Sequence, residues 1–351
     1  MDRRTFLRIS AISLAGTVIR VPGLRVKAQE PNADGFDPGG PPPQITRDGV
    51  TPSSWITPND QFYVQDITGG NPPRIDRDQW KLIMSGLARK PQLVTFADLM
   101  ELAQEHEVTL YRTLSCIGDP IGGNQIGNAE WTGIPLRVLI ERAQPREMVT
   151  KIVFRCQDGY HTAIPLEDAL DPNTVLVYKM NGVDLPPEHG YPVRLLNPGK
   201  YGQKCPKWII NMEFVAKDYL GYWETRGWSD EAAVRMATRI HQPQPDQRLP
   251  VGRYVISGSA FDGGNGSGIA RVEVSTDGGK TWNEATIWAP GTGLTWSLWM
   301  YEWEVAQPQQ RVRIVARSVN RRGEVQSATA ADPFPAGAEG YHTVEVEVLA
   351  S

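Results

Sequence analysis

The chain has 351 residues, of which 40% are hydrophobic, and its formal net charge is −4 at pH 7. A chain of this length can form two domains, and its acidic balance argues against nucleic acids and anionic membranes as partners. Its three cysteines, Cys116, Cys156 and Cys205, lie far apart with no CxxC or Cys/His spacing, which argues against zinc and iron–sulfur sites. The sequence has no CxxCH motif for haem c, so any electrons produced must leave through another protein.

Residues 1–28 have the pattern of a twin-arginine signal peptide. The run Asp2-Arg-Arg-Thr-Phe-Leu-Arg8 precedes a weakly apolar stretch at 9–21, and Val26-Lys-Ala28 has the small residues of a cleavage site. The stretch is too short and too polar for a permanent membrane span. We expect cleavage after Ala28, leaving 323 residues with a net charge of −9, and a periplasmic or otherwise exported protein. Because this route carries folded proteins, commonly with an inserted cofactor, we also expect a cofactor.

A first domain is expected over residues 55–240, after an extended Pro/Gly-rich arm at residues 29–54. Short β-rich runs alternate in this domain with helical patterns, which is typical of an α+β domain with mixed sheets. A helix is expected over residues 95–104, with Thr95 as its N-cap. The expected strands are 80–86, 108–114, 151–156 and 193–196.

A second domain is expected over residues 251–351, after a polar, proline-bearing linker at residues 241–250. Three of its runs alternate apolar and polar residues, and turns such as Asp277-Gly-Gly279 separate them. Short strands with no helix between them predict an immunoglobulin-like β-sandwich. We expect the aromatic residues of 296–303 to fill its core, the alternative being that they form an interface. The three runs are 271–276, 311–317 and 342–348.

Cys116 is a candidate metal ligand because of its place in the chain. The expected strand at 108–114 delivers it onto a Gly/Pro-rich loop, where backbone can pass close to a ligand. An amphipathic stretch at 136–142, which predicts a helix, follows Ala129-Glu-Trp-Thr-Gly-Ile-Pro-Leu136. A lone cysteine is most often a small buried hydrophobe, whereas a thiolate on such a loop suits a soft metal ion.

A basic cluster follows at residues 189–207 and predicts an anion site. Pro and Gly set a turn that holds His189 and Arg194 five residues apart, and three lysines follow on a Gly-bearing loop. Arginine offers a bidentate fork to phosphate. The alternative is a solvated basic surface, but the cluster stands in an otherwise acidic chain. The three lysines are Lys200, Lys204 and Lys207.

These motifs together resemble the sulfite oxidase family of molybdenum enzymes. The resemblance rests on the leader, the Leu-Ser-Cys loop with Ala-Glu-Trp-Thr-Gly-Ile-Pro-Leu, the segment Leu185-Pro-Pro-Glu-His-Gly-Tyr-Pro-Val-Arg194, and Val274-Ser-Thr-Asp-Gly-Gly-Lys-Thr-Trp282. It implies a molybdenum–molybdopterin cofactor, an external electron carrier such as a c-type cytochrome, and a second domain that forms a homodimer. Asp119 stands where the family usually has Asn.

The resemblance also implies roles for single residues. Cys116 would be the thiolate ligand of molybdenum and a catalytic residue. His189 and Arg194 would hold the molybdopterin phosphate. The other implied cofactor contacts are Tyr63, Asp158, Cys205 and Lys207.

The chain departs from the family where sulfite would bind. Gln65 and Ile121 stand where the resemblance places arginines, a further arginine that it places near Phe334 is also absent, and Trp228 stands where it places a tyrosine. Because each lost charge-assisted hydrogen bond is worth about 1.5–3 kcal/mol, we expect poor sulfite binding unless Arg226 or His161 turns inward. Gln65 and Trp228 are therefore the candidate substrate-side residues.

Three readings of function remain open at this stage. An exported molybdopterin oxidoreductase would transfer an oxygen atom to or from a small substrate. A reductase of sulfoxides such as oxidised methionine would use a neutral substrate, which agrees with the lost arginines. A cofactor-free dimeric binding module would need neither Cys116 nor the basic cluster.

Overall fold

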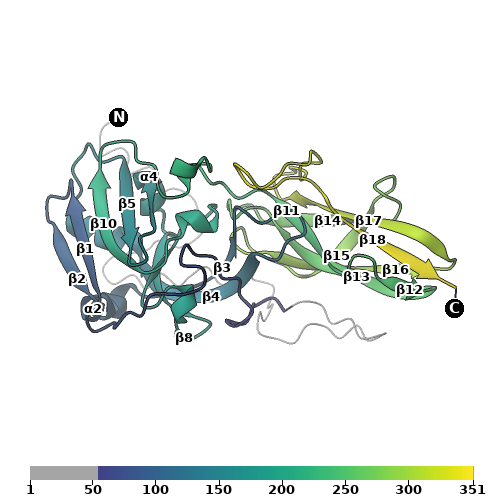
Figure 1. The fold of residues 1–351 in the computed structure, drawn as a ribbon, viewed down its shortest axis with the longest axis horizontal. Helices are drawn as coiled ribbons and strands as arrows, with labels where there is room; N and C mark the ends of the chain where they lie inside the picture. The colour runs from purple at the N-terminus through teal and green to yellow at the C-terminus, as the bar shows by residue number, and fades with distance from the viewer. Residues whose placement is uncertain (1–53, 351) are drawn as a thin grey trace, which may run out of the picture.

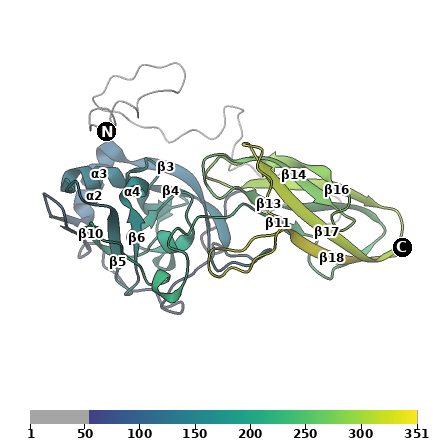
Figure 2. The same cartoon turned by 90° about the horizontal axis from the view of Figure 1, so that it is seen from above.

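The computed structural model describes residues 54–350, which form two domains joined end to end in an elongated molecule (Figures 1 and 2). The expected signal peptide and nearly all of the expected arm lie outside the described residues. Within residues 54–350, none of the helices has the length and apolar character needed to cross a bilayer.

The first domain is built mainly of strands. Its helices are α2 (Phe96–His106), α3 (Leu136–Ala143) and α4 (Leu166–Leu170), with the 3-10 turns η1 (Pro187–His189), η2 (Gly202–Lys204) and η3 (Glu224–Arg226). Its strands are β1 (Lys81–Gly86), β2 (Gln92–Thr95), β3 (Val108–Ser115), β4 (Ile126–Pro135), β5 (Lys151–Cys156), β6 (His161–Pro165), β7 (Val175–Met180), β8 (Val183–Asp184), β9 (Arg194–Leu196) and β10 (Ile209–Val215).

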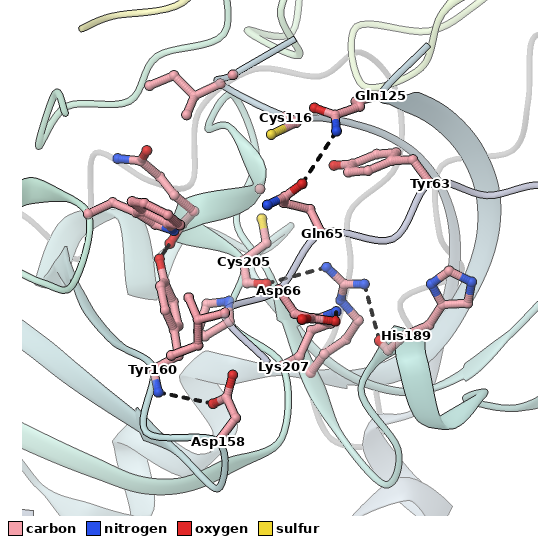
Figure 3. A pocket seen from close by; sticks show the side chains of 18 of the residues that line it. Tyr63, Gln65, Asp66, Cys116, Gln125, Asp158, Tyr160, His189, Cys205 and Lys207 are labelled. Atoms are coloured by element: carbon pink, nitrogen blue, oxygen red, sulfur yellow. Dashed lines mark hydrogen bonds and ion pairs between the residues drawn. The ribbon is translucent and has the colours of Figure 1, made fainter. Parts of the chain in front are cut away.

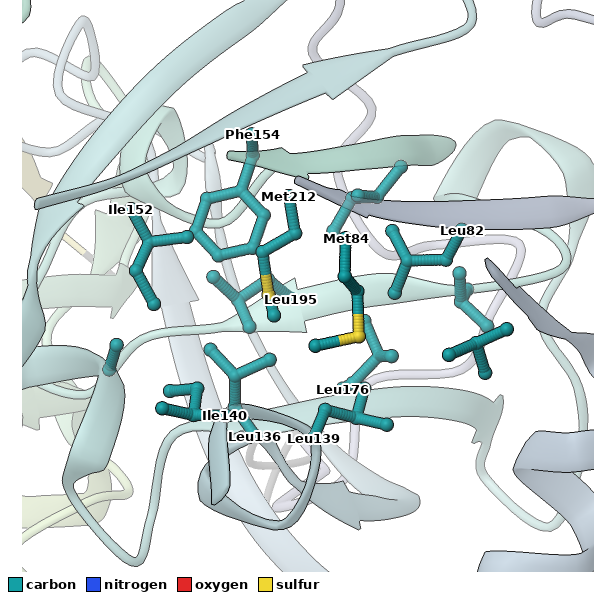
Figure 4. Close-up of a cluster of buried hydrophobic side chains, with 14 of the residues drawn as sticks. Leu82, Met84, Leu136, Leu139, Ile140, Ile152, Phe154, Leu176, Leu195 and Met212 are labelled. Atoms are coloured by element: carbon teal, nitrogen blue, oxygen red, sulfur yellow. The ribbon is translucent and has the colours of Figure 1, made fainter. Parts of the chain in front are cut away.

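These strands form two five-stranded sheets around one core. One sheet has the order β2-β1-β10-β5-β6, with β1 and β10 parallel, and the other has the order β3-β4-β7-β8 with β9 paired to β7. Figure 4 shows Met84, Phe154 and Met212 of the first sheet on one side of this core, and Leu176 of the second sheet with Leu139 of α3 on the other. Because both sheets pack against this core, the strand ends from which the edge loops leave are held in place.

The structure contains the predicted local elements. Thr95 caps α2 through a capping box with Asp98, as the sequence predicts. The predicted two-domain organisation is also found. The first domain has more sheet and less helix than the expected α+β alternation, because many connections are Gly/Pro-rich loops and single 3-10 turns.

The second domain is formed by strands alone. Eight strands pair in the order β11-β13-β16-β15-β14-β17-β18-β12, and their apolar faces enclose one core that includes the expected Trp299 and Trp303. The strands are β11 (Ala237–Gln242), β12 (Arg248–Pro250), β13 (Gly252–Phe261), β14 (Ile269–Ser275), β15 (Asn283–Ala289), β16 (Ser297–Val305), β17 (Gln309–Asn320) and β18 (His342–Leu349).

The segment expected to be a linker, residues 241–250, belongs to this sheet. β11 pairs with β13 from Ala237 onward, and β12 pairs with β18. Ile240 and Leu249 are buried in the core, and only the residues between β11 and β12 form the polar, proline-bearing turn. Because that turn is polar, the sequence pattern predicted a linker in place of the ends of β11 and β12 on either side of it.

β3 and β4 reach from the first domain to the second (Figure 1). Thr113 of β3 donates its amide to Leu294 O (3.1 Å), and its hydroxyl accepts from the Trp296 amide (2.8 Å). The Trp296 indole donates to Trp55 O (3.0 Å), and both tryptophans are buried in the junction. The strand pair that carries the Cys116 loop is thus packed between the two domains.

Candidate functional site

A cavity of about 350 Å³ opens in the first domain beside this junction (Figure 3). This volume lies in the range of small-molecule sites. Segments far apart in sequence line it, and nine of the predicted site residues are among them. Those residues are Tyr63, Gln65, Cys116, Asp158, His189, Arg194, Cys205, Lys207 and Trp228.

Cys116 lies at the tip of the β3–β4 hairpin. The two strands pair without interruption from Val108–Gly133 to Ser115–Ile126, and the Cys116 amide then donates to Gln125 O (2.9 Å). The loop at residues 116–125 therefore has a rigid base. Burial raises the pKa of the Cys116 thiol, so a metal ion is needed to hold this group as a thiolate at neutral pH.

The second domain holds the other side of this loop. Arg239 of β11 donates through Nη2 to the Asp119 carboxylate (2.7 Å) and through Nε to Gly123 O (3.2 Å). Asp119 also accepts from the Gln125 amide (3.1 Å). At Gly122, with φ +76°, a Cβ would lie 2.1 Å from His342 Nε2, so only glycine fits. A buried ion pair and a close backbone approach thus fix the cysteine loop.

Tyr63 lies opposite this loop, on a segment fastened by aromatic packing. Phe62 stacks on Tyr63 and packs edge-on against His189 and Trp131, with ring centroids 5.4, 5.6 and 5.8 Å apart respectively. Burial, followed by Cys116, raises the pKa of Tyr63 well above its usual value, so its hydroxyl remains protonated. A Cβ at Gly202 would lie 3.2 Å from that hydroxyl, and glycine therefore leaves room for it.

Arg194 is the central cation of the cavity. Its guanidinium donates to His189 O (3.1 Å) and Cys205 O (3.3 Å) and lies over the Trp131 ring. Its buried Nε has no hydrogen-bond partner within residues 54–350. A buried charge with an unused donor is costly unless a ligand completes it, so this nitrogen marks a place for an acceptor.

Lys207 adds a second cation near Arg194. Its ammonium donates to Glu188 O (2.7 Å) and lies 4.0 Å from the Asp66 carboxylate. Burial, followed by Arg194, lowers its pKa to about 7. Burial also raises the pKa of the neighbouring Asp158 carboxyl, which accepts from the Tyr160 amide. Arg194 and Lys207 repel each other, and an anion bound between them would offset this repulsion.

The other two predicted lysines face elsewhere. Lys204 is buried in an ion pair with Glu224 (2.5 Å) and Asp230 (2.8 Å), and Lys200 lies 3.5 Å from the Asp168 carboxylate. Neither lines the cavity. The prediction that all three lysines converge with Arg194 is therefore wrong for these two, because carboxylates from other segments bind them.

The end of the cavity near Cys116 has a different character. The Gln65 amide accepts from Gln125 Nε2 (3.3 Å) there. A Cβ built on Gly118 would lie 3.8 Å from both Cys116 Sγ and the Trp228 ring, so this ring lies beside the cysteine. Ile121 does not line the cavity but a smaller adjoining one, next to Arg239.

Neither residue considered as a compensating cation turns inward. The Arg226 guanidinium lies over the Tyr222 ring at 3.6 Å, and the His161 ring is bonded to the Tyr219 hydroxyl. Neither lines the cavity. Gln65, Gln125 and Trp228, at the Cys116 end of the cavity, are therefore all uncharged.

Sequence reasoning missed several lining residues. Gln125 and Asp66 line the cavity as neighbours of predicted residues, and Trp223 belongs to the same segment as Trp228. Tyr160 and Gln203 also line it, joined by a hydrogen bond of 2.6 Å from the tyrosine hydroxyl to the Gln203 carbonyl. Asp66 adjoins Gln65, and Tyr160 and Gln203 each lie two residues from a predicted contact, so sequence adjacency could have indicated all three.

The cavity thus has two chemically distinct ends. Figure 3 shows Cys116 at one end and Lys207 with Asp158 at the other, with Cys205 between them. A thiol on a rigid loop can ligate a soft metal ion, and two buried cations with an unused donor can hold a phosphate. A molecule with a metal at one end and a phosphate at the other fits this arrangement.

Two family models match the chain. An oxidoreductase molybdopterin binding domain matches residues 69–223, and a Mo-co oxidoreductase dimerisation domain matches residues 231–347. The first match includes Cys116, Arg194 and Lys207.

Among curated proteins, the mitochondrial sulfite oxidase of Rattus norvegicus is 29% identical over 380 residues, covering 94% of this chain and 67% of its own. The sulfite oxidase of Gallus gallus is 29% identical over 362 residues, covering 89% of this chain and 74% of its own. Among solved structures, the sulfane dehydrogenase SoxCD from Paracoccus pantotrophus superposes with a TM-score of 0.73 at 23% identity over 86% of each chain, which shows a shared fold.

Proposed function

Because this chain belongs to the sulfite oxidase family of molybdopterin oxidoreductases, we propose that it transfers an oxygen atom to or from a small neutral or weakly charged oxo compound. The chain is a molybdenum-dependent oxidoreductase with a molybdenum–molybdopterin cofactor. This family membership sets aside the alternative of a cofactor-free binding module. The proposal concerns the substrate, the roles of the site residues and the route of the electrons.

The two ends of the cavity would hold the two ends of the cofactor. Cys116 would ligate the molybdenum, which supplies the oxygen-transfer and redox chemistry when bound. Arg194 and Lys207 would bind the phosphate, and the unpaired Nε of Arg194 supports this role. The remaining predicted contacts, Tyr63, His189, Asp158 and Cys205, lie along the wall between these ends.

The charge of the cavity near Cys116 carries the substrate proposal. Its cationic lining residues are Arg194 and Lys207, and each has a place in the phosphate site. The side chains near Cys116 include the Gln65 amide, the Trp228 ring and the neutral Tyr63 hydroxyl. Moving an anion such as sulfite into such surroundings leaves its charge unpaired, which costs several kcal/mol. A neutral sulfur- or nitrogen-oxo compound avoids that cost.

The reaction we propose needs an external electron carrier. Oxidation adds an oxygen atom from water to the substrate and releases two protons and two electrons, and reduction consumes them. We propose a soluble carrier such as a c-type cytochrome, and export through the twin-arginine route. In the reducing direction this gives a sulfoxide reductase, which the neutral surroundings of Cys116 favour.

We further propose that the second domain is immunoglobulin-like and forms a homodimer. Its match to a dimerisation-domain model supports this assembly, and a symmetric interface is the usual one for homo-oligomers. Light scattering of the exported protein at micromolar concentration should report about twice the mass of one chain. Only a species at or below 39.0 kDa would count against the dimer.

Steady-state kinetics of the molybdenum-loaded enzyme test the substrate proposal. Sulfite oxidation with a cytochrome or ferricyanide is compared with reduction of dimethyl sulfoxide and of trimethylamine N-oxide by reduced methyl viologen. We expect the neutral compounds to have the higher kcat/KM. Efficient sulfite turnover with a micromolar KM would refute the proposal.

A further inference from the structure

We infer that Trp228 and Phe334 form an aromatic wall that selects substrates carrying a flat apolar substituent, such as an aryl sulfoxide or the corresponding sulfide. The inference rests on the proposed function, since it specifies which neutral oxo compound fits beside Cys116. The two rings come from different domains and pack edge to face, with centroids 5.3 Å apart at 80°.

Trp228 stands next to the reacting end of the cavity. Its ring edge and Cys116 Sγ are both 3.8 Å from a Cβ position on Gly118. The Trp228 side chain also packs against a small buried cluster of Ile117, Tyr201 and Ala232. The Trp228 ring therefore borders the same part of the cavity as the Cys116 thiol.

Buried ion pairs hold the segment that carries Trp228. The Lys204 ammonium is 2.5 Å from Glu224 and 2.8 Å from Asp230, and Lys151 also binds Asp230 (2.9 Å). The side chains of Lys204 and Glu224 are only 2% and 1% exposed, so water does not screen this pair. The aromatic wall is thus a fixed surface, not a mobile lid.

Phe334 is 55% exposed and lies on the loop between β17 and β18 of the second domain. Ala331 and Glu339 exchange two backbone hydrogen bonds at the base of this loop, and Pro335 O accepts from the Ser229 amide (2.9 Å). The ring tip lies over Gly227, where a Cβ would be 3.1 Å from it. Phe334 does not itself line the cavity, but its ring packs against Trp228, which does. The exposed ring of Phe334 therefore extends the apolar surface of Trp228 outward from the cavity.

The neighbouring cation, Arg226, does not face the aromatic wall. Arg226 is turned onto the Tyr222 ring, and its Nη1 donates to the Tyr222 carbonyl (2.6 Å). The Gln65 amide, which Gln125 orients, lines the same cavity as Trp228. An amide for one oxygen and an aromatic wall for a substituent match a compound such as methyl phenyl sulfoxide.

The test compares methyl phenyl sulfoxide with dimethyl sulfoxide in the molybdenum-loaded enzyme. Reduced methyl viologen supplies two electrons, and with two protons the sulfoxide becomes the sulfide and water. The reverse reaction, from the sulfides, uses ferricyanide. We expect at least a tenfold higher kcat/KM for the phenyl compound in the active direction. Phe334→Ala should lower this preference about three- to tenfold through KM, with little change for dimethyl sulfoxide.

Val325→Ala is the matched control, because Val325 is a 50% exposed apolar residue of the same domain whose backbone bridges to Val319 of β17, whereas the Phe334 ring packs against Trp228. It should leave the preference unchanged. In addition, binding of the unreactive methyl phenyl sulfone, measured by calorimetry, should weaken in Phe334→Ala and in Trp228→Leu.

Three results would overturn the inference. The first is equal kcat/KM for phenyl and methyl compounds in an enzyme that turns both over, which would leave the proposed function standing. The second is a Phe334→Ala defect seen with a cytochrome but absent with the dyes, which would make Phe334 a contact for the electron carrier. The third is a strong preference for sulfite, which would refute the proposed function as well.

Discussion

Replacing Arg239 with methionine should destabilise the protein and loosen the loop that carries Cys116. Asp119 and Arg239 are 5% and 7% exposed, and their charged groups lie 2.7 Å apart across the domain junction. Without Arg239, the Asp119 carboxylate stays buried with the Gln125 amide as its one remaining hydrogen-bond donor among the described residues. Removing one partner of a buried pair costs about 3–5 kcal/mol.

Urea unfolding, followed by tryptophan fluorescence, measures this loss because urea does not screen the ion pair. The matched control is Arg253→Met, which removes an exposed pair with Glu304 whose side chains are 71% and 67% exposed. That change should cost less than about 1 kcal/mol. Arg239→Lys keeps the charge but loses the two-pronged contact to Asp119 and Gly123, so its loss should be intermediate.

A second measurement separates loop positioning from general stability. In cofactor-free protein below the unfolding transition, the rate at which a thiol reagent modifies Cys116 should rise severalfold in Arg239→Met. Cys156 and Cys205 are buried and serve as internal references for global unfolding. An unchanged unfolding free energy together with an unchanged Cys116 rate would refute the view that Arg239 holds this loop.

Further changes at the two ends of the cavity have separate expected outcomes. Cys116→Ala should abolish turnover and alter the molybdenum spectrum without altering the circular dichroism; unchanged activity and spectrum would remove Cys116 as the ligand. The pKa of Lys207 is lowered to about 7, and a phosphate monoester binds the protonated form of this lysine. Calorimetry on cofactor-free protein should therefore show that the affinity for a phosphate monoester falls as the pH rises above 7. Lys207→Arg should make that profile flat, and a flat profile in the unmodified protein would contradict the assignment. Gln65→Arg should lower the KM for sulfite about tenfold or more, whereas Ile121→Arg should bring no comparable gain because Ile121 lines the adjoining cavity; the reverse order would place Ile121 at the substrate.

The sequence was most informative about local structure. The Thr95 cap, the β3 strand before Cys116 and the alternating strands β14, β17 and β18 were all predicted correctly. Each follows from interactions between residues close in the chain or from one buried face, which a periodic pattern records. The linker predicted over residues 241–250 was wrong because it contains only the last two residues of β11 and the three residues of β12, too few to produce such a pattern.

The same sequence did not determine which charges reach the cavity. Arg194, Lys200, Lys204 and Lys207 lie within fourteen residues of one another, yet the structure turns Arg194 and Lys207 inward and pairs the other two with distant carboxylates. A long cationic side chain can point either way from its backbone. Its direction depends on which carboxylate the fold brings near it.

By itself, the sequence determined the family motifs, the cysteine loop and the loss of the arginines expected to bind sulfite. Only the tertiary structure decided that Arg239 of the second domain holds the Cys116 loop, and that Phe334 lies against Trp228. These contacts join residues more than a hundred positions apart. They depend on how two separately folded cores dock, and no local pattern in either segment encodes the partner that it meets.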